Sequence, residues 1–365
     1  MTFPPVSALD IFADVSEFTT FARSKGLRFH LVSTSVQDLI FQEAVRLSAK
    51  SAASSPLAWF DEYHTYNDTK AWYLDLSRQF PQLATFVPTV GKTWENRDLF
   101  AFRITANPNP SRPKIWVQCN IHAREWITSA TCQYAFHHIL NNYGVDQAVT
   151  ELLNSAEFVV IPFVNPDGYD FTWSNDRLWR KNRRNNGGSY GVDLNRNYDV
   201  QWGGVGSSPL PSSDTYHGPG PNSEPEVQSL VAYFSSLSNV IASLDVHSYS
   251  QLILRPYTHI AAASANEADL KQVSDEMVSI ILGVHGKRFT PGPWYSALYP
   301  SSGVSQDYYY AHGSPFSLTI ELRPTTAVPG FVLPPDEIIP SGEEVTPALL
   351  HYAQFALNSN LRKQN

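Results

Sequence analysis

From Trp59 onward, short apolar runs alternate along the chain with helical patterns. The candidate strands cover residues 99–104, 114–119, 157–164, 240–246, 251–254 and 316–322. Several of these runs are continuously apolar, as strands are when both faces of their sheet are buried. The pattern therefore predicts an α/β fold in which helices cover a central sheet.

The helical patterns cover residues 69–80, 128–141, 224–237, 266–284 and 343–357. The fourth shows the periodicity best, because its apolar side chains recur three and four positions apart. We expect this stripe to face the core; its residues are Leu270, Val273, Met277, Ile280, Ile281 and Val284. Segments 182–191 and 203–222 are rich in Gly, Pro, Ser and Asn, which favours loops.

Residues 1–52 have the pattern of a small separate unit with its linker. A helix is expected from the candidate N-cap Ser16 to Gly26, followed by a strand over 28–32 and a second helix over 37–47. A linker-like stretch follows over 48–56, and Arg46 and Lys50 are sites where a trypsin-like protease can cut. The sequence thus predicts two parts, 1–52 and a main domain over 53–365.

Composition and charge limit the partners of the protein. A net charge of -8 and a pI of about 5.7 argue against nucleic acid or an anionic membrane as the main partner. No apolar run reaches the length of a transmembrane span, and the start of the sequence as written does not have the pattern of a signal peptide. The tripeptide Asn67-Asp68-Thr69 is a glycosylation sequon, which hints at a secreted glycoprotein.

The sequence has two cysteines, Cys119 and Cys132. They flank the stretch Asn120-Ile-His-Ala-Arg-Glu-Trp126, which lies between a candidate strand and a candidate helix. Considered alone, the pair fits either a disulfide across this loop or two buried free thiols.

Polar residues with metal-binding or acid–base chemistry follow several strands. His122 and Glu125 lie in the loop after 114–119, His247 follows 240–246, and Glu321 lies near the end of 316–322. In α/β sheets, ligand sites lie beyond the carboxyl ends of the strands. An H-x-x-E pair alone is also common in solvated loops, but its nitrogen and oxygen donors suit Zn²⁺, and a third ligand must come from elsewhere in the fold.

A longer set of motifs occurs in order along the chain. It comprises His122-Ala-Arg-Glu-Trp126, Arg177-Leu-Trp-Arg-Lys181, Asp193-Leu-Asn-Arg-Asn197, His247-Ser-Tyr-Ser250, Tyr299, Glu321-Leu-Arg323 and Gly330-Phe-Val-Leu-Pro334. On these motifs the chain resembles the zinc metallocarboxypeptidases of the pancreatic carboxypeptidase A/B type, from residue 63 to about residue 351. The resemblance implies the fold of that family, a mixed, mostly buried sheet with helices on both faces.

The resemblance also implies roles at the centre of the site. His122, Glu125 and His247 would bind one zinc ion, and Asp193 would orient the first histidine. Glu321 would act as general base. Arg180 would stabilise the oxyanion that develops during peptide hydrolysis.

The remaining family positions imply an exopeptidase that acts on the C-termini of peptides or proteins. A guanidinium can anchor the terminal carboxylate bidentately. The implied anchor consists of Arg196, Asn195 and Tyr299, and the implied neighbouring subsites contain Arg124, Tyr249 and Phe331.

The implied base of the specificity pocket is Gln306, where A-type enzymes have an apolar residue and B-type enzymes an acidic one. With Thr319, Ser301 and Trp294 nearby, we expect release of aromatic, aliphatic or polar uncharged residues. A C-terminal Lys or Arg should be disfavoured, because the sequence offers no carboxylate at that position.

The resemblance further implies how the protein is made and regulated. The cysteines resemble a B-type pair, which favours a Cys119–Cys132 disulfide. Residues 1–52 resemble the carboxyl half of the family's inhibitory prodomain, so we expect a small partial α+β prodomain and a secreted, monomeric zymogen that an endoprotease activates. Two other functions stay open, a catalytically silent binding relative and an amidohydrolase of small N-acyl amino acids.

Overall fold

The computed structural model describes residues 15–26, 36–48 and 57–364. The expected strand over 28–32 and most of the expected linker lie outside this part. The strands are β1 (Ala84–Lys92), β2 (Asp98–Ile104), β3 (Lys114–Cys119), β4 (Glu157–Ile161), β5 (Val240–Ser248), β6 (Leu252–Arg255), β7 (Thr290–Pro293) and β8 (Phe316–Leu322). They form an 8-stranded sheet in the order β1-β2-β4-β3-β5-β8-β6-β7.

The centre of the sheet is parallel and its flanks are mixed. Strands β4, β3, β5 and β8 run parallel to one another, whereas β2 pairs antiparallel with β4 and β6 pairs antiparallel with β8. Every residue of β3, β4, β5 and β8 is buried. The mixed, mostly buried sheet expected from the sequence is therefore confirmed, and its parallel centre brings several carboxyl strand ends to one edge.

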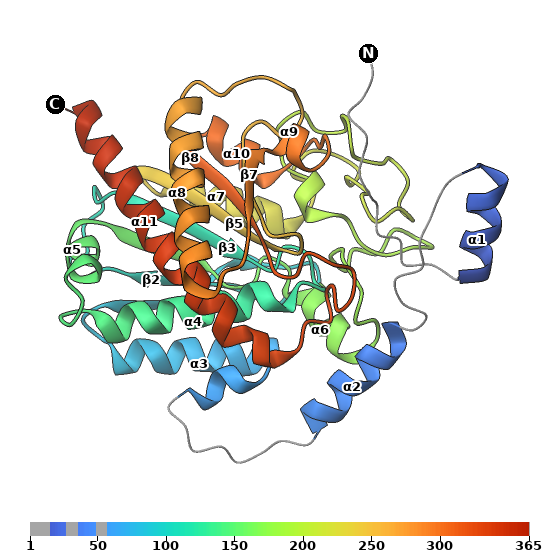
Figure 1. The fold of residues 1–365 in the computed structure, drawn as a ribbon, viewed down its shortest axis with the longest axis horizontal. Coiled ribbons are helices and arrows are strands. Elements are labelled where there is room, and N and C mark those ends of the chain that lie inside the picture. Colours follow the sequence, from blue (N-terminus) through green and yellow to red (C-terminus); the bar gives the residue numbers. More distant parts are fainter. Residues whose placement is uncertain (1–14, 27–35, 49–56, 365) are drawn as a thin grey trace.

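Helices cover both faces of this sheet (Figure 1). The larger core packs against α3 (Tyr66–Gln79), α4 (Trp126–Asn142), α8 (Glu267–His285) and α11 (Ile338–Gln364), and the smaller core against α7 (Pro225–Ser236) and α10 (Ser305–Ala311). Along β3, Ile115 and Val117 belong to the larger core and Trp116 to the smaller. This alternation follows from the period of two of a strand, and it explains why the run is apolar at successive positions.

Several elements differ from the sequence expectation. The edge strand β1 has a mixed pattern of burial and β7 is the proline-rich TPGP, so neither has a continuous apolar run. Strand β4 ends at Ile161 rather than at Val164, because Pro162 follows and cannot donate a ladder hydrogen bond. Val284 was wrongly expected in the core stripe of α8; it is 38% exposed, in the last turn of the helix.

Short helices were also missed. They are α5 (Gln147–Ser155), α6 (Pro166–Ser174), α9 (Trp294–Ala297), α10 and the 3₁₀ turns η1 (Ala58–Asp61), η2 (Leu194–Arg196) and η3 (Pro335–Glu337). Segments this short do not show two full periods of an apolar stripe. The two expected loops are confirmed, since only isolated bridges, such as the one between Asn185 and Tyr190, interrupt them.

The amino-terminal part contains α1 (Val15–Ser24) and α2 (Val36–Ser48), close to the expected helices. Helix α2 contacts the large domain through Glu43, which pairs with Arg177. Within the described ranges, no helix is both long enough and apolar enough to cross a membrane.

Candidate functional site

The loop after β3 is shaped by Asn120. This residue has a left-handed φ of 56°, which Asn tolerates better than most side chains. Its side-chain amide donates toward the carbonyl oxygens of His122, Ala123 and Glu125, at 3.3 to 3.4 Å. Its backbone N–H donates to the hydroxyl of Thr128, at 3.0 Å. These bonds fold the loop back on itself and present His122 and Glu125 on the same side.

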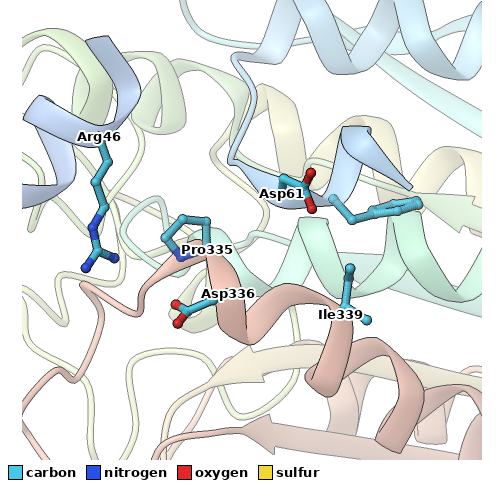
Figure 2. Close-up of a pocket in the computed structure, with 6 residues that line it drawn as sticks. Arg46, Asp61, Pro335, Asp336 and Ile339 are labelled. Carbon is cyan, nitrogen blue, oxygen red and sulfur yellow. The ribbon is translucent and has the colours of Figure 1, made fainter. Parts of the chain in front are cut away.

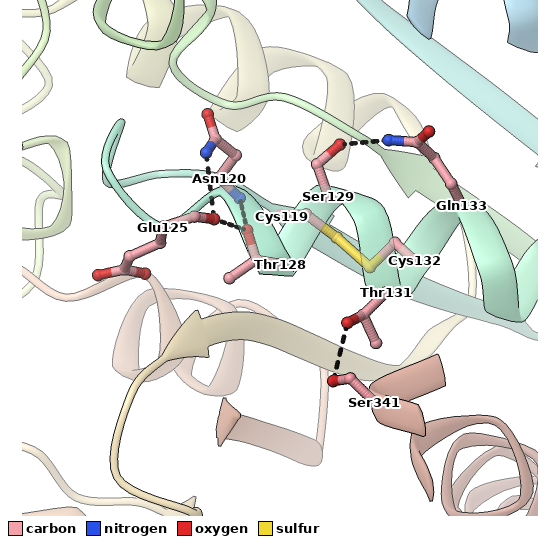
Figure 3. The surroundings of a disulfide bond; sticks show 9 residues. All are labelled: Cys119, Asn120, Glu125, Thr128, Ser129, Thr131, Cys132, Gln133 and Ser341. Carbon is pink, nitrogen blue, oxygen red and sulfur yellow. Dashed lines mark hydrogen bonds between the residues drawn. A yellow bond between two sulfur atoms is a disulfide. The ribbon is translucent and has the colours of Figure 1, made fainter. Parts of the chain in front are cut away.

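A disulfide closes the base of the same loop (Figure 3). It joins Cys119, at the end of β3, to Cys132 on α4, and both residues are buried. Nearby, Thr131 donates to Ser341 of α11 at 3.0 Å, which ties α4 to a second helix. The disulfide expected from the family resemblance is thus present, and it encloses the segment that carries His122 and Glu125.

His122, Glu125 and His247 come together as a compact group. One ligand atom from each lies within 4.8 Å of the others, and all three residues are buried. The carboxylate of Glu125 lies between the rings, with Oε1 2.7 Å from His122 Nδ1 and Oε2 3.2 Å from His247 Nδ1. Burial raises the pKa of Glu125, but the two imidazoles outweigh it and hold that pKa below its usual range. Two imidazoles and an ionised carboxylate are a donor set that fits zinc.

Asp193 supports this group from behind. Its Oδ1 lies 3.3 Å from Nε2 of His122, and its Oδ2 accepts from Arg180 at 2.8 and 3.1 Å. Burial alone would raise the pKa of Asp193, but Arg180 and Arg196 hold it well below its usual range. Asp193 is therefore an ionised acceptor that can fix the ring of His122.

Glu321 lies beside the metal group on β8. It is the register partner of His247 on β5, so the two residues are neighbours at the same edge of the sheet. Burial, opposed in part by His247, raises the pKa of Glu321 to about 8. None of the described residues forms a hydrogen bond with its carboxylate, although the residue is only 8% exposed. Glu321 is thus a carboxyl group held in place by the strand and left open to a reacting partner.

Arg196 is almost fully buried, at 1% exposure. Its Nε donates to the carbonyl of Gly206 at 2.9 Å and its Nη1 to the carbonyl of Asn195 at 2.7 Å. Its Nη2 has no hydrogen-bond partner among the described residues. The segment that follows Tyr299 packs close to it, since a Cβ on Gly303 would lie 2.2 Å from the carbonyl oxygen of Arg196. A buried guanidinium with one unused donor can donate to one further acceptor.

The other expected substrate residues lie around this centre. Arg124 places its guanidinium 4.3 Å from the ring centre of Phe331, and Phe331 packs edge to face against Tyr249 at 4.9 Å. The ring of Tyr299 is 6.0 Å from the Arg196 guanidinium, and Tyr299 is 42% exposed. The structure therefore brings Arg124, Tyr249 and Phe331 together, and it leaves Tyr299 accessible to solvent beside Arg196.

Gln306 and Thr319 are fully buried, and neither side chain has a hydrogen-bond partner in the described structure. Thr319 pairs in register with Asp245 of β5. The hydroxyl of Ser305, the residue before Gln306, donates to Oδ2 of Asp245, whereas Oδ1 has no partner. Asp245 was not predicted from the sequence, because it lies within an apolar strand run, where a single carboxyl group gives no periodic pattern.

A cavity of about 400 Å³ lies away from these residues, between α2, η1, η3 and the start of α11. Its lining consists of Arg46, Phe60, Asp61, Pro335, Asp336 and Ile339. Figure 2 shows Arg46 of α2 on one side and Pro335 and Asp336 on the other. None of the residues expected to bind metal or substrate lines it, so it is a feature of the contact between α2 and the large domain.

The family model described as zinc carboxypeptidase matches residues 69–348. The chain belongs to the zinc carboxypeptidase family. It is 36% identical to carboxypeptidase A2 of Mus musculus over 336 residues, which are 91% of this chain and 80% of that protein. It is 34% identical to carboxypeptidase A1 of Sus scrofa over 358 residues, covering 97% of this chain and 85% of that protein.

Solved structures agree with this assignment. The crystal structure of carboxypeptidase A from Helicoverpa armigera matches with a TM-score of 0.86 at 30% identity, over 94% of this chain and 86% of that one. The crystal structure of thrombin activatable fibrinolysis inhibitor matches with a TM-score of 0.86 at 32% identity and the same coverage. The protein is thus a metallocarboxypeptidase, a zinc hydrolase that acts on peptide bonds, and His122, Glu125 and His247 form its metal-binding group.

Proposed function

We propose that this zinc carboxypeptidase releases single uncharged residues from the C-termini of peptides and proteins. The observation that carries the proposal is the unused Nη2 of buried Arg196, close to the metal-binding group. A terminal carboxylate would complete the hydrogen bonding of this guanidinium, with Asn195 and Tyr299 beside it. Such an anchor sets the last peptide bond over the metal, which is what separates an exopeptidase from an endopeptidase.

Glu321 is the proposed general base. Its carboxylate has no competing hydrogen bond in the described structure, and it lies next to His247 at the sheet edge. In its ionised form it takes a proton from the attacking water at a carboxylate oxygen and passes that proton to the leaving amine. When bound, zinc supplies Lewis acidity, which polarises a carbonyl group and makes water more acidic.

Arg180 is the proposed stabiliser of the developing oxyanion. It is buried, and its Nε and Nη2 are held by Asp193. Burial lowers the pKa of Arg180, but Asp193, Tyr299 and Glu125 together outweigh burial and raise that pKa above its usual range, so the group stays charged. A fixed positive group costs little reorganisation when negative charge develops on the substrate.

Gln306 and Thr319 are the proposed floor of the pocket for the C-terminal side chain, with Ser301 and Trp294 nearby. The unpartnered amide of Gln306 and hydroxyl of Thr319 can pair with a polar uncharged side chain. A C-terminal Lys or Arg was expected to be disfavoured because position 306 has no carboxylate, but Asp245 is the register partner of Thr319 and is a nearby carboxyl group. Release of C-terminal Lys or Arg would therefore show that Asp245, and not Gln306, determines the specificity of the pocket.

We also propose that the chain is a secreted zymogen and that residues 1–52 form its prodomain. The support is the contact of α2 with the large domain through Glu43 and Arg177, together with the Cys119–Cys132 disulfide. An endoprotease that cuts after Arg46 or Lys50 would release α2. Arg46 is exposed on α2, and Lys50 lies outside the described residues.

The proposal is tested with peptides that differ only in the last residue, ending in Phe, Leu, Gln, Lys or Glu, after limited trypsin treatment. We expect release of single residues from Phe, Leu and Gln peptides, loss of all release with a zinc chelator, and no cleavage of the same peptides carrying a C-terminal amide. Arg196→Met should raise KM for the free acids while zinc content stays unchanged. Fastest release of Lys would overturn the proposed specificity.

The two other functions give different results in the same assay. Cleavage of N-acyl amino acids without cleavage of longer peptides would identify an amidohydrolase. A zinc-loaded protein that cleaves no substrate would identify a silent binding relative. The presence of Glu321 and the unused donor of Arg196 favour the exopeptidase over both.

A further inference from the structure

The two histidines of the metal-binding group are held in the same way on their far side. In each ring Nδ1 faces Glu125, at 2.7 Å for His122 and 3.2 Å for His247. In each ring Nε2 faces a buried aspartate, Asp193 at 3.3 Å and Asp245 at 3.1 Å. Nε2 of His247 also lies 3.3 Å from the side-chain amide nitrogen of Asn195, a longer contact than the one to Asp245. The metal-binding group is therefore flanked by a carboxylate on both sides.

Asp245 is placed for this contact by the strand that carries His247. Both residues belong to β5 and lie two positions apart, so their side chains emerge on the same face of the sheet. Asp245 is 2% exposed, and Oδ2 accepts from Ser305 as well as facing His247. A carboxyl group buried to this degree is costly unless it is paired or hydrogen-bonded, and Ser305 and His247 supply these partners.

We propose that Asp245 is a positioning residue of the zinc centre. Its Oδ2 accepts the Nε2 proton of His247, which fixes the tautomer in which Nδ1 carries the lone pair directed at the metal site. It also restrains the ring about its χ angles, as Asp193 does for His122. The proposal rests on zinc binding by His247 and is independent of which substrate the enzyme cleaves.

The two aspartates differ in their charge partners. Asp193 is paired with Arg180, and Arg196 lies 4.0 Å away. Within the described residues, no lysine or arginine pairs with Asp245, and its Oδ1 has no partner. In the described structure the Asp245 carboxyl group therefore has the His247 ring and the Ser305 hydroxyl as its partners, and the contact with Nε2 is what orients this ring toward the metal-binding group.

The test measures zinc affinity directly, by competition with a chromogenic chelator at neutral pH. We expect Asp245→Ala to weaken zinc binding by about 10- to 100-fold, the usual effect of removing such a partner. Asp245→Asn keeps a hydrogen-bond acceptor but loses the charge, so we expect a smaller loss. In the cobalt-substituted protein, Asp245→Ala should shift the visible absorption bands, because the ligand ring is no longer held.

Asp307→Asn is the matched control. Asp307 is also buried, lies on the same helix as Ser305 and accepts from an imidazole, with Oδ2 2.8 Å from His259 Nδ1, but it does not contact the metal group. This variant should change thermal stability without changing zinc affinity.

Each outcome decides the proposal. If folded Asp245→Ala, or Asp245→Asn should the alanine variant fail to fold, binds zinc as tightly as the parent protein with an unchanged cobalt spectrum, the proposal is overturned. An equal loss in Asp307→Asn would also overturn it, since the effect would then be general. A parent protein that binds zinc but releases no C-terminal residue would refute the proposed function and leave this test intact.

Discussion

Glu43 of α2 lies against Arg177 of the large domain, with Oε2 2.6 Å from Nε, although 134 residues separate them in sequence. Arg177 also stacks on Trp126 at 3.7 Å and donates to the carbonyls of Arg124 and Phe331 at 2.8 and 2.7 Å. One buried arginine therefore connects α2 to the loop that carries His122 and Glu125, here called the zinc loop, and to residues expected to bind substrate.

Replacing Glu43 with alanine should detach α2. The change leaves the buried Arg177 without its carboxylate partner, with only the two carbonyls and the Trp126 ring in contact, and breaking a buried ion pair costs about 3–5 kcal/mol. We expect faster cleavage by trypsin and higher peptidase activity of the uncleaved chain. Gln42→Ala is the control, because Gln42 is the exposed neighbour of Glu43 on the same helix. Equal trypsin sensitivity of the two variants would show that the pair does not hold α2.

Glu321→Gln should slow turnover strongly while leaving the metal in place. The variant keeps the shape of the side chain but cannot accept the proton of the attacking water, so we expect kcat to fall by about 10²- to 10⁴-fold. Metal analysis of the same sample should show an unchanged zinc content, in contrast to Glu125→Gln, which loses a ligand. Retention of near-normal kcat by Glu321→Gln would exclude it as general base.

The centre of the fold was predictable because buried strands have a recognisable local sequence pattern. Strands β3, β5 and β8 are buried on both faces, and such strands are apolar at nearly every position. His122 and His247 differ from these apolar runs, because a polar residue near the end of a buried strand is costly unless it has a partner or a ligand. The zinc ligands could thus be found from the sequence together with the order of the family motifs.

What could not be predicted depends on contacts between distant segments. Asp245 lies in the same apolar strand as His247, and only the folded geometry shows that it reaches Nε2 of that ring. The Glu43–Arg177 pair could not be predicted either: Arg177 belongs to a family motif, but Glu43 alone has the pattern of an ordinary surface charge, and nothing in the sequence connects the two. The edge strand β1 was missed because it is partly exposed, so its sequence has no continuous apolar run.

Glu226 should make the protein less stable as the pH rises. Glu226 is fully buried on α7. Burial raises its pKa to about 8, although a hydrogen bond from the backbone N–H of Trp94 lowers that pKa in part. The unfolded chain loses this proton near 4.5, whereas the folded protein keeps it until about 8, so raising the pH through this interval favours unfolding. The expected loss is on the order of a few kcal/mol, since one pKa unit corresponds to about 1.4 kcal/mol.

Urea unfolding at several pH values between these limits measures this effect. Glu226→Gln should flatten the pH dependence, while Glu151→Gln, at an exposed position of α5, should leave it unchanged. The same slope in Glu226→Gln and the parent protein would assign the pH dependence to other groups.

The Cys119–Cys132 disulfide should stabilise both the fold and the zinc loop. The bridge spans a sequence separation of 13 and encloses His122 and Glu125, so it restricts the unfolded chain over the segment that must be ordered to bind metal. In the chain-entropy model, a disulfide that closes a loop of this size adds about 3 kcal/mol to the free energy of unfolding. The double variant Cys119→Ala/Cys132→Ala should therefore lose about this much free energy of unfolding in urea, and it should release zinc to a chelator faster than the parent protein.

A reducing agent should destabilise the parent protein and leave the double variant unaffected, which separates loss of the bond from loss of side-chain packing. If reduction changes neither the unfolding midpoint nor the rate of zinc release, the bond does not restrain the loop.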